Sequence, residues 1–167
     1  VDYYAGLGQT ITEGSRAMDG DTLVISNASV GTSTPEGGFT ANLPELRLRE
    51  VGDGSVEVTF PAAMPIKITG KNETGTVGEV DMSLVQTGMT MLVSGAPEDM
   101  LYDFKADEMG VKLDKAVEDG KEIPLVVDVV LKGNAGKYHM TKSGATTVTS
   151  DFSSEQMVFN LSGTSPD

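Results

Sequence analysis

The sequence predicts an all-β domain, a curved antiparallel meander or half-barrel of about ten to twelve strands carrying a short N-terminal helix. Apolar residues alternate with polar ones throughout Leu43–Thr69, which is typical of half-buried antiparallel strands. Thr, Ser, Val and Gly are plentiful and Ala-rich helical stretches are missing, which favours β structure. A two-sheet sandwich is the architectural alternative. The 167 residues suit one domain, residues 1–167, with a core of its own.

The N-terminal third predicts one helix followed by strands. Val1–Gly8 has an aromatic and leucine stripe and ends in glycine, which indicates the last turns of a helix. Thr10–Ala17 and Thr22–Val30 are expected to be strands around an Asp19-Gly20-Asp21 turn. Gly31–Gly38 is rich in Ser, Thr, Gly and Pro and is expected to be a loop.

Leu43–Thr69 predicts three consecutive hairpin-connected strands. With loops of about three residues, every apolar residue of the three strands falls on one face. The same register sets Arg47 opposite Glu57, and Glu57 opposite Lys67, on the other face. This row of alternating charges supports the predicted register.

Residues 80–113 continue the alternation. Thr87-Gly88 is expected to make a two-residue turn that closes a hairpin. Met100–Ala106 is expected to be a strand, although Pro97 favours a helix as the rival, and 109–113 gives a further strand out of phase with it. The pairs that the hairpin sets opposite one another are Leu84 with Met91 and Met82 with Val93.

The last third predicts a turn and four strands. Glu118-Asp119-Gly120 is the expected turn. Ile123–Leu131 is apolar on both faces, which predicts a strand covered on both sides, with the N-terminal helix as one candidate cover. Alternation around 138–140, 146–148 and 157–161 indicates three more strands.

Composition excludes several classes of function. The formal charge is −13, from 25 acidic and 12 basic residues, so clustered cations for nucleic acid are missing and no nucleic-acid partner is expected. The absence of cysteine excludes disulfides, thiol catalysis and thiolate metal sites. No run approaches the ~18 apolar residues of a membrane helix, so no transmembrane segment is predicted.

Few residues of this sequence suggest a catalytic site. His139 is the single histidine and is expected to point outward from its strand, and no Gly-x-Ser-x-Gly nucleophile turn is present. Asp128 is the most unusual carboxylate, but paired carboxylates in glycosidases work beside aromatic platforms and the chain has no Trp. We therefore expect no enzyme activity, no catalytic residue, no cofactor and no metal site.

Methionine is the unusual resource of this chain, because its flexible side chain adapts to irregular partners. Several methionines fall close together on the apolar face of the predicted sheet, where ordinary core filling is the alternative explanation. The residues predicted to line a concave site for an apolar ligand are Met82, Leu84, Met89, Met91, Tyr102 and Phe104.

Five segments carry a resemblance to a family: YYAGLGQTITEGS, DGDTLVI, LPELRLREVGDGSVEVTFP, FKADEMGVKLD and DGKEIPLVVDV. They resemble the N-terminal part of uncharacterised exported proteins of alphaproteobacteria, a family known as a domain of unknown function. The resemblance implies a removed signal peptide, a periplasmic or extracellular location in a Gram-negative envelope, and a longer parent protein. It implies no activity.

A helix followed by a long meander also resembles, at the level of fold, the periplasmic carriers of lipids and lipoproteins. The leading expectation is therefore a non-enzymatic envelope protein that binds an apolar or lipid-like ligand in a methionine-lined concave sheet. The alternative is a structural or assembly protein that binds a protein partner through a sheet edge or an acidic face. Fold similarity does not decide between them.

Overall fold

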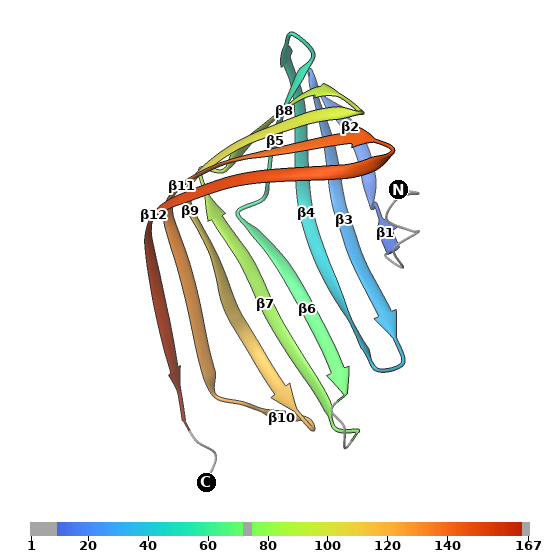
Figure 1. The fold of residues 1–167 in the computed structure, drawn as a ribbon. Coiled ribbons are helices and arrows are strands. Elements are labelled where there is room, and N and C mark those ends of the chain that lie inside the picture. The colour runs from blue at the N-terminus through green and yellow to red at the C-terminus, as the bar shows by residue number, and fades with distance from the viewer. Residues whose placement is uncertain (1–9, 72–74, 165–167) are drawn as a thin grey trace.

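The computed structural model describes residues 10–71 and 75–164, and it confirms the all-β class and the expected number of strands. All twelve strands belong to one antiparallel sheet (Figure 1), so a two-sheet sandwich is not formed. The predicted helix at Val1–Gly8 lies outside the described residues, and the described part contains no helix. The strands are β1 (Thr10–Thr12), β2 (Ser15–Asp19), β3 (Thr22–Thr34), β4 (Gly37–Gly52), β5 (Ser55–Thr59), β6 (Ala63–Lys71), β7 (Val77–Thr87), β8 (Thr90–Ala96), β9 (Asp99–Glu118), β10 (Lys121–Glu122), β11 (Leu125–Ser143) and β12 (Ala145–Gly163).

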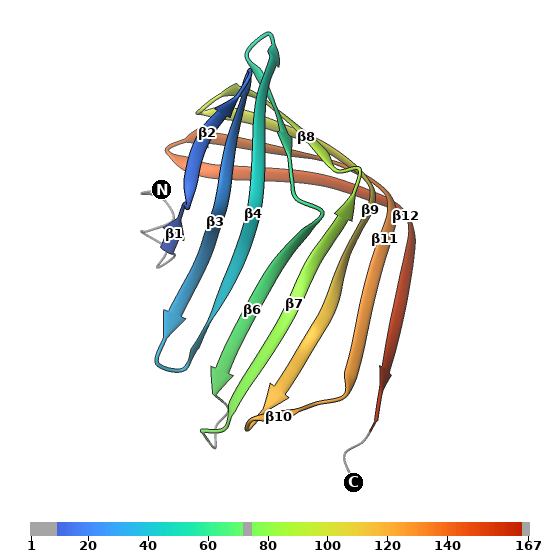
Figure 2. The ribbon, with the colours of Figure 1, turned by 180° about the vertical axis from the view of Figure 1, so that it is seen from behind.

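The five longest strands, β3, β4, β9, β11 and β12, share one line of irregularities that we call the fold line. One opposed pair is left out of each ladder there without a shift of register, and the apolar residues change from one set of alternate positions to the other. Asn27 and Gly133 have positive φ values of 54° and 62°, the left-handed conformation that bulges use. The residues on the line are Asn27, Pro44, Asp107, Gly133 and Glu155. Figures 1 and 2 show β9, β11 and β12 turning sharply, so that the sheet has two arms. The upper arm includes β2, β5 and β8, and the lower arm includes β1, β6 and β7.

The two arms are joined by a ring of paired strands. β4 pairs with β6 through residues 37–41 and with β5 through residues 47–52. β9 pairs with β8 through residues 99–105 and with β7 through residues 108–118. Because β5 pairs with β8 and β6 with β7, the circuit closes as β4-β5-β8-β9-β7-β6. The predicted half-barrel is therefore a partial ring with open flanks, with β1, β2 and β3 on one side and β11 and β12 on the other.

The predicted register of Leu43–Thr69 is wrong. Asp53 and Gly54 both have positive φ and form a tight two-residue turn, so Leu48 pairs with Val58 and Arg49 with Glu57. β5 and β6 do not pair at all, because the chain crosses between the arms after Phe60. Lys67 therefore lies where β6 pairs with β7 and is not opposite Glu57. Its Nζ lies 2.8 Å from Glu79 Oε2.

The predicted hairpin at Thr87-Gly88 is also not formed. β7 pairs with β6 and β9, while β8 pairs with β5 and β9, so the chain crosses here from the lower arm to the upper arm. Gln86 ties this crossing to the one after Phe60. Its side-chain amide donates to the Phe60 and Pro61 carbonyls at 2.9 and 3.1 Å and accepts the Met89 N–H at 2.9 Å.

The remaining differences have one physical cause, which is that the strands are longer than the alternation suggested. Met100–Ala106 is a strand, as predicted, but the out-of-phase segment 109–113 continues the same strand beyond the fold line. The three segments expected after residue 138 belong to β11 and β12. β3 and β4 extend into the expected loop Gly31–Gly38. The expected cover on both sides of Ile123–Leu131 is not found in the described structure, where Val126 is 50% exposed.

Candidate functional site

One face of the upper arm is a row of apolar side chains that crosses eight strands. Each member pairs with the next, and the only position without a large side chain is a glycine. Val58, in the middle of the row, is 7% exposed, so this face is the inner one. The row is Met18, Leu23, Leu48, Val58, Met91, Phe104, Gly136 and Phe152.

The lower arm has two similar inner rows. Ala116, which pairs with Val80 on the same face, is 6% exposed and marks this side as the interior. The first row is Ile11, Val30, Ala41, Ile66, Met82 and Leu113, and the second is Met64, Leu84, Val111, Val129 and Phe159.

The outer face carries charge instead. A row across the upper arm pairs Arg49 with Glu57 at 2.9 Å and Lys137 with Asp103 at 3.5 Å. These pairs are exposed, so each contributes little to stability. Their position shows that the sheet has a solvated outer face and an apolar inner face in both arms.

The inner face is poorly covered. Among the described residues, three apolar residues are buried, Val58, Ala106 and Ala116, and no large side chain is completely buried. The inner rows are mostly partly exposed, and their members on β12 are exposed, with Phe152 at 50% and Phe159 at 59%. Because a compact domain buries most of its large apolar side chains, the inner face is an open apolar surface, which we call the trough.

The predicted ligand site is distributed over both arms of the trough. Met82 and Leu84 lie in the lower rows, and Met91 and Phe104 lie in the upper row. Tyr102 lies beside them, paired with Val93 and Tyr138, and Met89 lies at the crossing before β8. Five of the six residues therefore lie on strands of the trough, but the predicted pairs of Leu84 with Met91 and Met82 with Val93 are not formed.

Aromatic side chains connect the centre of the trough to its β12 margin. The ring of Phe104 on β9 stacks on that of Phe152 on β12, with centroids 6.0 Å apart and planes at 19°. Gly136 lies between them in the row, and a Cβ there would be 2.5 Å from the Phe104 ring. Glycine is therefore required for the ring to cross β11. Tyr102 and Tyr138 pack edge to face nearby at 5.6 Å.

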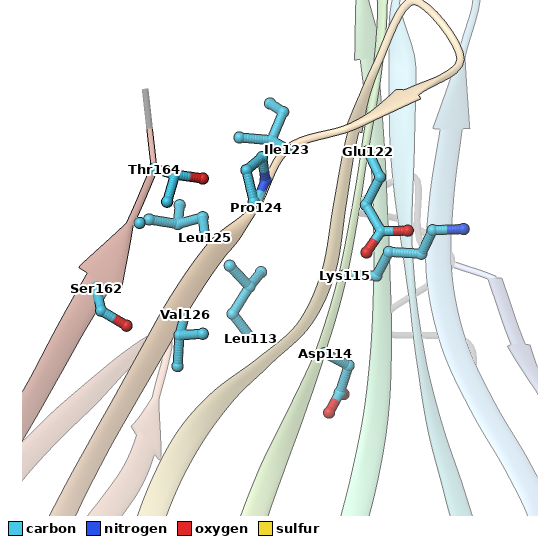
Figure 3. Close-up of a pocket in the computed structure, with 11 residues that line it drawn as sticks. Leu113, Asp114, Lys115, Glu122, Ile123, Pro124, Leu125, Val126, Ser162 and Thr164 are labelled. Atoms are coloured by element: carbon cyan, nitrogen blue, oxygen red, sulfur yellow. The ribbon is translucent and has the colours of Figure 1, made fainter. Parts of the chain in front are cut away.

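A shallow hollow lies at the far end of the lower arm, where β9 and β11 diverge around β10. Figure 3 shows Leu113 and Leu125 at this hollow, with Asp114, Lys115 and Glu122 on one side. The hollow opens to solvent and shares none of the six residues predicted for the ligand site. We interpret it as the open end of the trough.

His139 is exposed on the outer face, as predicted, and its Nε2 lies 2.6 Å from Asp99 Oδ1. Within residues 10–71 and 75–164, no group of three or more His, Cys, Asp or Glu side chains is placed to hold a metal ion. The search for helices that could cross a membrane found none in the described segments.

Sequence reasoning did not identify the exposed apolar margin on β12. The segments 146–148 and 157–161 were predicted only as strands, and Phe152 was not assigned, because it is a lone aromatic in the polar run SDFSSE. The alternation of Met157, Phe159 and Leu161 was the available signal. It predicts a strand with one apolar face but cannot show that nothing covers that face.

Comparison of the chain with family models, with curated proteins and with solved structures found no match. The resemblance to exported alphaproteobacterial proteins therefore stays a prediction from the sequence.

Proposed function

We propose that the chain is a non-enzymatic binding protein whose trough accepts an apolar, lipid-like ligand. The observation that carries this proposal is an apolar inner face, continuous across both arms, that the protein's own side chains leave half-exposed. An apolar surface of this kind in a monomeric protein marks an interaction site.

The trough is suited to a chain rather than to a polar molecule. The three inner rows contain no charged residue, so the recognition of a charged head group would be weak. Methionines in both arms, such as Met82 and Met91, can adjust to chains of different length. Each fully buried methylene contributes about 0.8 kcal/mol, and less in an open trough, so we expect affinity to rise about two- to fourfold for each added methylene.

The test is a titration with a fluorescent acyl chain that carries an uncharged head group, together with mass spectrometry of lipids extracted from protein purified from its native host. Met91→Lys places a charge in the upper row and should weaken binding at least tenfold, because the ammonium must be desolvated by the ligand. Leu92→Lys is the matched control, since Leu92 is the next residue of the same strand, lies on the outer face and is 41% exposed.

Saturable binding that increases with chain length and is lost in Met91→Lys alone would support the proposal. No co-purifying lipid and no saturable binding would contradict it. Binding that is unchanged in Met91→Lys would also contradict it, because the ligand would then lie elsewhere on the sheet.

A further inference from the structure

The edge of the sheet formed by β12 is unpaired and apolar. β12 pairs on one side with β11, and no described strand pairs with its other side. Sheet edges are normally protected by Lys, Pro or a break, but the 19 residues of β12 form one strand without Lys, Arg or Pro, although the fold line crosses it at Glu155. Its exposed apolar side chains on the inner face are Val148 at 44%, Phe152 at 50%, Met157 at 68%, Phe159 at 59% and Leu161 at 58%, and Val158 is exposed at 40% on the outer face.

The hydrogen bonds at both ends of β11 identify the free amides. Thr164 N–H donates to the Pro124 carbonyl, and Lys142 N–H donates to the Glu98 carbonyl on the β9 side. Because antiparallel bonds alternate along a strand, the amides that point away from β11 are the even-numbered ones before the fold line and the odd-numbered ones after it. These residues are Val148, Ser150, Phe152 and Ser154, then Met157, Phe159 and Leu161.

The residues with free amides are also those whose side chains lie on the inner face. In an antiparallel partner strand, the residues with free amides must also have their side chains on the inner face, and the phase must change opposite the fold line of β12. A second copy of β12 meets both conditions. If two copies pair about an axis between Glu155 and Gln156, each even residue before the fold line faces an odd residue after it. Phe152 then faces Phe159 of the second copy, and inner faces meet inner faces.

We propose that two copies of this chain form a symmetric dimer by antiparallel pairing of their β12 strands. The bend favours this register, because the pairing axis lies beside Glu155, where β12 turns, so the bend of one copy matches the bend of the other. The charges also permit it, because Asp151 faces Asn160 of the second copy and Glu155 faces Gln156. The net charge of −13 on each copy opposes association, so the dimer should become tighter as salt increases.

The test is sedimentation equilibrium between about 1 and 500 µM, a range suited to an interface of moderate size. The expected result is a reversible change from 17.5 kDa to twice that mass. Ser150→Pro removes a free edge amide that makes no ladder bond within one copy, and it should leave a folded monomer. Phe159→Lys should have the same effect by placing a solvated charge opposite Phe152 of the second copy.

The register has its own test. Asn160 faces Asp151 of the second copy, so Asn160→Lys should tighten the dimer several-fold and Asn160→Asp should weaken it, with circular dichroism confirming the fold of every variant. A 17.5 kDa species at all concentrations, or a dimer unchanged by Ser150→Pro, would overturn the proposal. Equal affinities of the two Asn160 variants would overturn the register. The readout is mass, so neither result depends on whether the trough binds lipid.

Discussion

The two edges of the sheet differ in how they meet water. The β1–β2 edge is short and is interrupted at Glu13-Gly14, and Arg16 binds Glu13 there through two hydrogen bonds of 2.6 Å. Arg47 on β4 extends over β3 to Asp19 at the end of β2. In the described structure the β12 edge has no such break or ion pair: it is long, and most of its residues with free amides are apolar.

This contrast separates a sheet edge that is protected from one that is not. Breaks and charges at a sheet edge prevent further strands from adding, which is their usual role in natural β proteins. A sheet that protects one edge and leaves the other apolar can extend in one direction. The β12 margin of the trough is therefore the side at which we expect both the ligand and the second copy to approach.

The substitution with the largest expected effect disrupts the aromatic contact between β12 and the rest of the sheet. Gly136→Ala places a Cβ 2.5 Å from the Phe104 ring and 2.9 Å from the Asp151 carbonyl, so the ring must leave Phe152. We expect a loss of about 1–3 kcal/mol in the free energy of unfolding by urea. Hydrogen exchange should accelerate first in the upper half of β12.

Gly70→Ala is the matched control, because Gly70 also lies within a strand and a Cβ there meets nothing within 4 Å. Its effect should stay within about 0.5 kcal/mol. Equal destabilisation by the two substitutions would show that the aromatic stack is not responsible for the loss.

A smaller effect compares one side chain from each edge. Phe152→Ala removes a half-exposed ring that stacks on Phe104, and we expect it to cost about 1–2 kcal/mol. Met18→Ala, at the opposite end of the same row, removes a side chain that is 65% exposed and should cost less than about 0.5 kcal/mol. Urea unfolding at about 1 µM, where we expect monomers, measures both. A larger cost for Met18 would reverse our account of the two edges.

Alternation in the sequence was sufficient to predict the strands and their apolar face, because side-chain direction depends on local geometry alone. It was insufficient for the register, because one tight turn at Asp53-Gly54 shifts the pairing of β4 with β5 by two residues. The crossings after Phe60 and Gly88 could not be predicted. They depend on Gln86, whose amide has no local signature.

The sequence contains a signal for the bend, but we interpreted it as a break between two strands. The change of phase between Ala106 and Met109 predicted a break between two strands, whereas it marks the fold line inside β9. A phase change of the apolar alternation can therefore mark an irregularity within one strand instead of the end of a strand. Residues 152–157 are a second case, because Phe152 and Met157 lie in the same strand on either side of the fold line.

The smallest expected effect concerns the charged edge. The hydrogen bonds from Arg16 hold the pKa of the Glu13 carboxylate below its ordinary value. A carboxylate with a lowered pKa in the folded state stabilises the fold above its unfolded pKa, and this contribution is lost as pH falls through the folded pKa. Glu13→Gln should therefore lower the unfolding midpoint slightly at pH 7 and not at all near pH 2. The measurement is the difference between the two proteins in thermal midpoint across pH, with Glu36→Gln as the control, because Glu36 lies in the turn between β3 and β4, away from this ion pair and from β12. If the difference for Glu13→Gln persists at pH 2, the ion pair with Arg16 is not its cause, and the protection of this edge would then rest on its short strands and its break at Gly14.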